Sequence, residues 1–139
     1  MPGRYTFTQQ EPTTITKFGN VMIYVDDPRG VADFWINTIG FSEVDAQELD
    51  GRALFVEITP TVESDAHLTL FDRKLVAQSS PELDLATPSI LFKSADITEM
   101  RDKLVEAGVT VGGIVEAGGM TTFNFADPEG NWFAVQQVV

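Results

Sequence analysis

Residues 125–135 read Phe-Ala-Asp-Pro-Glu-Gly-Asn-Trp-Phe-Ala-Val, and this stretch decides how the end of the chain folds. Its centre, Asp-Pro-Glu-Gly-Asn at 127–131, combines the residue types that favour a tight turn, with a glycine available for positive φ. Apolar residues alternate with other side chains on both sides of this turn, which is typical of strands. We therefore predict a hairpin with strands over residues 121–126 and 132–138.

Before this hairpin the sequence predicts a strand, a helix and a further strand. Asp96 is a favourable helix N-cap, and Glu99 has the spacing of a capping box. Apolar residues recur at helical spacing from position 97 to position 107, and Gly108 stands where the helix should end. The flanking strands are predicted at residues 89–93 and 109–116.

The first half of the chain repeats this plan. Asp27 is a good N-cap, Pro28 suits the first helical position, and Gly40 stands at the expected helix end. Strands are predicted at residues 18–25 before this helix and at 41–48, 52–59 and 67–71 after it. Asp50-Gly51 is a hairpin turn signal between the second and third of these strands.

Each half is therefore predicted to be a β-α-β-β-β module, at about residues 17–72 and 88–138. We expect an α+β fold with a single domain over residues 16–139 and a loose, polar N-terminal arm over residues 1–15. The connection at residues 72–87 is long, and connections of that length are usually functional or mobile. A generic ferredoxin-like domain would explain one half but not the duplication.

Composition and charge narrow the range of partners. Nine basic against twenty-one acidic residues give a net charge of −12, which argues against nucleic acid and anionic membranes and is compatible with a cationic ligand. The same charge also serves solubility alone. The absence of cysteine excludes disulfides, thiolate metal sites and cysteine nucleophiles. The opening residues 1–6 lack the layout of a signal peptide, so a cytoplasmic location is expected.

Two segments resemble a known family. Tyr24-Val25-Asp26-Asp27, Phe34-Trp35 and Ile39-Gly40-Phe41 resemble the opening of vicinal-oxygen-chelate proteins, the superfamily of glyoxalases, bleomycin resistance proteins and extradiol dioxygenases. The hairpin at residues 125–135 resembles their closing hairpin and is the more specific signal. The resemblance covers about residues 17–138. It implies two βαβββ modules forming curled mixed sheets around a cleft, and a homodimer.

The resemblance also locates a metal site that this sequence has lost. The four positions that carry His or Glu ligands in metal-dependent members fall on Asn20, Thr69, Ser89 and Ala134. A catalytic divalent ion needs about three strong protein donors, and these residues do not supply them. The single histidine, His67, cannot make a ligand set, and a structural role is expected for it. We therefore expect no bound metal and no cofactor.

Period-2 alternation selects the cleft face independently of the resemblance. The strongly apolar faces of the strands should pack on the helices, so the opposite faces should line the cleft. This face mixes aromatic and small polar side chains, as ligand sites do, although the same aromatics are also typical of a core or a dimer interface. The candidate ligand-binding residues are Asn20, Met22, Tyr24, Glu57, His67, Thr69, Phe71, Ser89, Leu91, Trp132 and Ala134.

Three functions follow from these observations. The first is a metal-independent protein that binds and sequesters a small aromatic or cationic molecule, similar to the bleomycin-resistance branch. The second is a glyoxalase-like lyase or isomerase, or a dioxygenase, whose usual metal ligands are absent. The third is a degenerate scaffold or interaction module. No catalytic residue is identified by the sequence, and fold similarity does not decide between these functions.

Overall fold

The computed structural model describes residues 14, 15 and 17–138, so most of the predicted N-terminal arm lies outside the described residues. The first module contains a strand, a helix that continues into a π-helical turn, and three further strands. These elements are β1 (Val21–Val25), α1 (Pro28–Phe34), η1 (Trp35–Ile39), β2 (Ser42–Leu49), β3 (Arg52–Thr59) and β4 (Leu68–Asp72).

The caps and turns of the first module form where the sequence predicted them. The Asp27 carboxylate accepts a hydrogen bond from the backbone N–H of Gly30 at 3.1 Å and so starts α1. Gly40 ends the π-helical turn with φ of 102°, in the left-handed region that glycine tolerates. Asp50 and Gly51 have φ of 54° and 82°, as a primed hairpin turn between β2 and β3 requires.

The second module repeats the first with a shorter outer strand. Its elements are β5 (Leu91–Ser94), α3 (Ile97–Glu106), β6 (Val115–Ala117), β7 (Met120–Ala126) and β8 (Trp132–Gln137). Asp96 caps α3 by accepting from the backbone N–H of Glu99 at 3.0 Å. The reciprocal half of the predicted capping box is not made, because the Glu99 carboxylate pairs with Lys103 at 3.0 Å instead.

The connecting segments contain one helix that was not predicted and one predicted strand that is mostly absent. A helix, α2 (Arg73–Ser79), occupies the first part of the long connection, with Asp72 accepting from the backbone N–H groups of Lys74 and Leu75. The strand expected over residues 109–116 is reduced to β6 and a single bridge between Val111 and Phe125. The Gly-Gly pair at residues 112 and 113 lies between these two pieces, and glycine weakens a strand interior.

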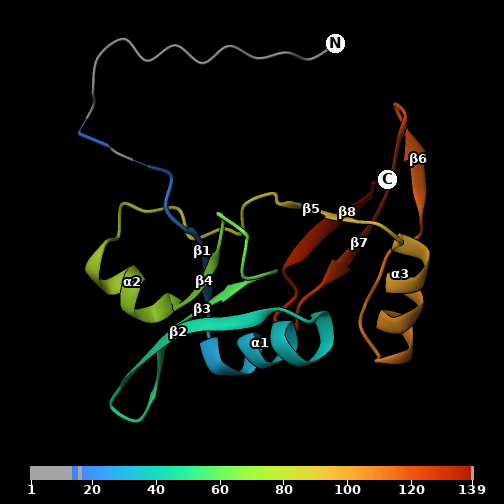
Figure 1. The fold of residues 1–139 in the computed structure, drawn as a ribbon. Helices are drawn as coiled ribbons and strands as arrows, with labels where there is room; N and C mark the ends of the chain where they lie inside the picture. Colours follow the sequence, from blue (N-terminus) through green and yellow to red (C-terminus); the bar gives the residue numbers. More distant parts are fainter. Residues whose placement is uncertain (1–13, 16, 139) are drawn as a thin grey trace.

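The two modules share one topology. The sheets have strand orders β1-β4-β3-β2 and β5-β8-β7-β6. In each sheet the first and last strands of the module run parallel, and the other pairs are antiparallel. Figure 1 shows the two sheets side by side, with α1 beneath the first and α3 beside the second. The predicted α+β class with two βαβββ modules is confirmed.

The cores of the two modules merge around Trp35, which is fully buried at the junction of α1 and η1. Its ring lies 4.9 Å from that of Phe41 in its own module, and 5.7 Å and 4.9 Å from Phe92 and Phe133 in the second sheet. The helix therefore contacts the apolar face of the second sheet as well as that of its own. Among the described residues, no helix is long and apolar enough to cross a membrane.

Candidate functional site

Two rows of side chains cross the face of the first sheet that points away from the shared core. Strand register places Met22, Thr69 and Glu57 side by side in one row across β1, β4 and β3. The next row contains Tyr24, Phe71 and Phe55. The rings of Phe55 and Phe71 are stacked, with centroids 5.9 Å apart and planes 8° from parallel. This face thus offers a polar row beside an aromatic row.

The polar row is held by hydrogen bonds among the predicted site residues. The Asn20 amide donates to the Thr69 hydroxyl at 2.9 Å, which joins the segment before β1 to β4. His67 Nδ1 lies 2.6 Å from a carboxylate oxygen of Glu57, and its Nε2 lies 3.1 Å from the Ser64 carbonyl oxygen. Both ring nitrogens of His67 therefore face acceptors within the chain. The four polar residues predicted on this sheet therefore form two neighbouring hydrogen-bonded pairs, Asn20 with Thr69 and His67 with Glu57.

The equivalent face of the second sheet surrounds a shallow hollow. Leu91, Ala134 and Asn124 form a row across β5, β8 and β7. A hollow of about 190 Å³ is lined by Ser89, Ile90, Asn124, Trp132, Phe133 and Ala134. Leu91 and Trp132 remain 44% and 50% exposed, which is unusual for large apolar side chains on a sheet. Trp132 is therefore not packed under a helix.

The predicted site residues fall into two sets related by the internal repeat. Met22 and Leu91 begin equivalent rows, so Asn20 and Ser89, each two residues earlier, occupy matching places. Thr69 and Ala134 are the centres of those rows. The hollow that contains Ser89 and Ala134 includes no residue of the first sheet. A single chain therefore presents the two sets as separate surfaces.

Sequence reasoning missed two residues of these surfaces. Phe55 stacks on Phe71, and the same strand parity that selected Glu57 would have selected Phe55. Asn124 lines the hollow because the hairpin pairs it with Ala134, and the turn at residues 127–131 fixes that register. The sequence signal was present in both cases.

Comparison with known proteins identifies the family. The model of the Glyoxalase/Bleomycin resistance protein/Dioxygenase superfamily matches residues 17–135. The chain belongs to this superfamily. A curated relative from Bacillus subtilis (strain 168), the uncharacterized protein YetH, is 25% identical over 124 residues, which cover 88% of this chain and 99% of YetH.

Two solved structures have the same fold as this chain. A member from Sphaerobacter thermophilus DSM 20745 is 28% identical, with a TM-score of 0.70 over 91% of this chain and all of that one. TnmS3, an antibiotic binding protein from Streptomyces sp. CB03234, is 22% identical, with a TM-score of 0.73 over 92% of this chain and all of that chain. At 22% identity, the similarity to TnmS3 shows a shared fold.

The superfamily includes metal-dependent enzymes, but the residues that this chain carries at their ligand positions do not fit a metal. Asn20, Thr69, Ser89 and Ala134 offer neutral oxygens or no donor at all. The Asn20 amide and the Thr69 hydroxyl are moreover bonded to each other. Within residues 14, 15 and 17–138 no three His, Asp or Glu side chains are grouped so as to hold an ion. We derive no chemical step through a metal.

Proposed function

We propose that this protein is a metal-independent binding protein for a small, flat, neutral or cationic organic molecule. The observation that carries the proposal is the half-exposed Trp132 in the wall of a hollow that Ser89 and Asn124 also line, with the exposed Leu91 next to Ala134 on the same face of the sheet. Half-exposed aromatic and aliphatic surface beside a few placed polar groups is the usual composition of a ligand site. Trp132 would stack on the ligand, and Ser89 would orient it.

The first sheet supplies the other wall in this proposal. Tyr24 continues the stacked row of Phe71 and Phe55, and an aromatic row accepts either a flat ring or a cation. Asn20 retains its amide oxygen as an acceptor after donating to Thr69. The net charge of −12 would favour the approach of a cation.

We infer that the working form is a homodimer in which the first sheet of one copy faces the second sheet of the other. The support for this inference is the shared core, because α1 and η1 contact the apolar faces of both sheets and leave the two candidate surfaces apart. Each surface alone is open, and a second copy would close both. Closure would also cover the exposed Leu91 and Trp132.

The geometry favours binding over proton-transfer catalysis. A general base needs a free lone pair within reach of its substrate. His67, the best candidate, uses one ring nitrogen toward Glu57 and the other toward Ser64, so it ties the loop before β4 to the sheet. The name of TnmS3 as an antibiotic binding protein agrees with a binding role on this fold.

A ligand titration of two variants tests the proposal. A thermal-shift screen of flat neutral and cationic aromatic compounds supplies the ligand, and calorimetric titration measures its affinity. Trp132→Ala should weaken binding about tenfold, or about 1.4 kcal/mol, because one stack and its burial are lost. Val105→Ala, at a similarly exposed position on α3, should leave the affinity unchanged. Equal affinities in both variants would remove Trp132 from the site.

A further inference from the structure

We propose that the ligand of the cleft is uncharged, and that His67 sets this preference by neutralising Glu57 within the first sheet. The inference rests on the proposed function, and it narrows the ligand class from a neutral or cationic molecule to a neutral one. His67 is then a specificity-determining residue that acts through Glu57. A cation that enters the cleft finds the carboxylate of this inner strand already paired.

Glu57 lies where a ligand on the first sheet would meet it. It belongs to β3, an inner strand, and the register places it beside Thr69 and Met22 on the candidate face. Its side chain is only 19% exposed. A partly buried carboxylate is costly unless it is paired, so some cation must accompany it, either from the chain or from the ligand.

His67 is that cation, because its surroundings indicate an imidazolium. Its Nδ1 lies 2.6 Å from Glu57 Oε2, and its Nε2 lies 3.1 Å from the Ser64 carbonyl oxygen. Both partners are acceptors, and only the doubly protonated ring donates from both nitrogens. Asp45 is the register partner of Glu57 on β2, and two like charges directly opposite each other destabilise a sheet. The positive ring beside Glu57 offsets that repulsion.

The candidate faces have no net charge when His67 carries both ring protons. The rows of the first sheet that hold the candidate residues contribute two carboxylates, Glu57 and Asp45, and Asp45 lies exposed on the edge strand β2. On the second sheet, Lys93 follows Leu91 on the same side of β5, and the other members of its row are uncharged. Two carboxylates thus face one ammonium and one imidazolium, a balance that suits a neutral ligand.

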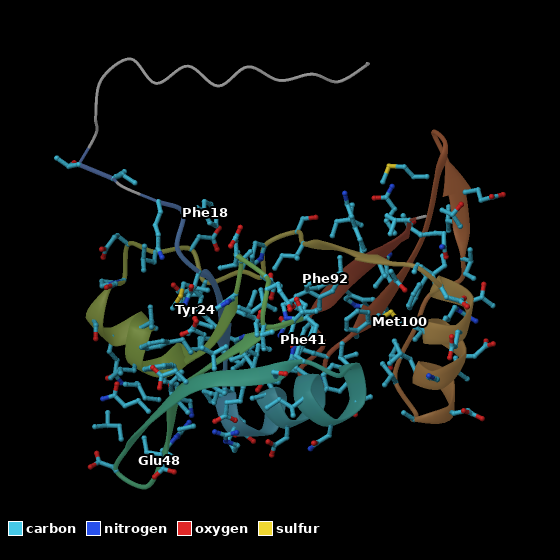
Figure 2. All side chains as sticks on the ribbon, in the orientation of Figure 1. Phe18, Tyr24, Phe41, Glu48, Phe92 and Met100 are labelled. Atoms are coloured by element: carbon cyan, nitrogen blue, oxygen red, sulfur yellow. The ribbon has the colours of Figure 1, made fainter. Side chains whose placement is uncertain are left out.

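Acidic side chains outside these faces act mainly on the approach of a ligand. Figure 2 shows Glu48 at the end of the β2–β3 hairpin that lies away from Tyr24. Glu43 is the register partner of the buried Ile58, so it lies on the other side of the sheet, and it pairs with Arg29 at 2.8 Å. Exposed charges more than about 8 Å apart are largely screened at physiological salt. The net charge of −12 therefore does not decide which ligand the cleft holds.

Two probes with one shape and different charges test the proposal. The first, 3-methylbenzamide, is neutral, and the second, 1-methylnicotinamide, is a similar flat ring with a permanent positive charge. At about pH 6, where histidine commonly carries its second proton, nuclear magnetic resonance titrations give both dissociation constants. The wild type should bind the neutral probe about tenfold more tightly, because the cation loses hydration and gains no free carboxylate.

The variant His67→Gln should reverse this preference in favour of the cationic probe by about tenfold, since it leaves the Glu57 carboxylate free to accept the cation. The double variant His67→Gln/Glu57→Gln should return the preference to the neutral probe. Lys74→Gln, at an exposed position on α2, removes one positive charge as His67→Gln does, and it should leave the wild-type preference unchanged. Circular dichroism checks that each variant is folded.

The wild type alone can contradict the proposal, whether or not His67→Gln folds. Equal affinities for the two probes, or tighter binding of the cationic one, would overturn it while the observed binding still supports the proposed function. A preference that His67→Gln does not change would overturn it as well. The absence of binding by either probe would count against the proposed function and against this inference together.

Discussion

The carboxylate of Glu129 accepts a hydrogen bond from the backbone N–H of Asp27 at 2.9 Å, although 102 residues separate them. Its other oxygen accepts from the backbone N–H of Asp26 at 2.8 Å. Glu129 belongs to the turn between β7 and β8, which Asp127 shapes by accepting from the backbone N–H groups of Glu129 and Asn131, both at 2.9 Å. The closing turn of the second module therefore anchors the start of α1 in the first.

Removing this anchor should destabilise the whole domain. Glu129→Ala deletes two charge-assisted hydrogen bonds at a helix start, and we expect the free energy of unfolding to fall by about 1 kcal/mol, since the pair is exposed. Urea denaturation measures this change. Glu82→Ala, an exposed position in the connection between the modules, is the matched control and should change stability by less than about 0.5 kcal/mol. Equal effects of the two variants would show that Glu129 does not join the modules.

Glu43 on β2 is expected to contribute to the stability of the folded state in a pH-dependent way. Arg29 Nη1 donates to its carboxylate at 2.8 Å, and this hydrogen bond lowers the pKa of Glu43 below its ordinary value. A carboxylate with a lowered pKa stabilises the folded state above its ordinary pKa of 4.5, and this stabilisation is lost as the pH falls through the lowered value. Both side chains are about two-fifths exposed, so solvent screens the pair.

Substitution of Glu43 isolates that contribution. Glu43→Gln should reduce the free energy of unfolding by about 0.5 kcal/mol at neutral pH, and the difference from the wild type should vanish in acid. Unfolding curves over a pH series provide the measurement. Val44→Ala, at an exposed position on the same strand, should show no such pH-dependent difference because it leaves every charge in place. A gap between wild type and Glu43→Gln that persists in acid would assign the effect to packing instead of charge.

The sequence predicted the fold well wherever local chemistry determines structure. Asp27 and Asp96 cap helices because a short side chain that accepts hydrogen bonds satisfies a backbone N–H group that has no partner within the first turn of the helix. Asp50-Gly51 turns the first hairpin because both positions require positive φ. The helix α2 was missed because none of its residues is fully buried, so it leaves no apolar period to detect.

The candidate site was predicted less completely, because it depends on contacts between modules. Alternation along β8 correctly separated the buried Phe133 and Val135 from the exposed Trp132. The alternation of side chains along a strand predicts which face of the sheet is apolar, but it does not predict what packs on that face. The packing of Trp35 against the second sheet was therefore not predicted. The separation of the Asn20 surface from the Ser89 surface follows from that packing.

Treatment with a metal chelator should leave the stability and the ligand affinity of the protein unchanged. The reason is the donor set, since Asn20, Thr69, Ser89 and Ala134 lack the imidazole and carboxylate groups that hold divalent transition metals. Elemental analysis of purified protein should find no stoichiometric zinc, nickel, iron or manganese. Dialysis against EDTA, and readdition of zinc, should leave the melting temperature and the ligand affinity unaltered. One equivalent of bound metal whose removal lowers either quantity would show that another ligand set exists.

A mixed-dimer experiment tests whether two copies build each binding site. Tyr24→Ala damages the wall from the first sheet, and Trp132→Ala damages the wall from the second. If each cleft combines the first sheet of one copy with the second sheet of its partner, a heterodimer of these variants contains one doubly damaged cleft and one intact cleft. We expect each homodimer to bind about tenfold more weakly than the wild type, because each cleft has lost one stack.

The heterodimer, isolated with two different affinity tags, should regain wild-type affinity at half the wild-type number of sites. This recovery cannot occur if both walls come from one chain, because every cleft would then carry one damaged wall. Calorimetric titration gives affinity and site number together, and light scattering establishes the dimer beforehand. A heterodimer with two equally weak sites, or a protein that is monomeric at micromolar concentration, would show that the cleft is not shared between copies.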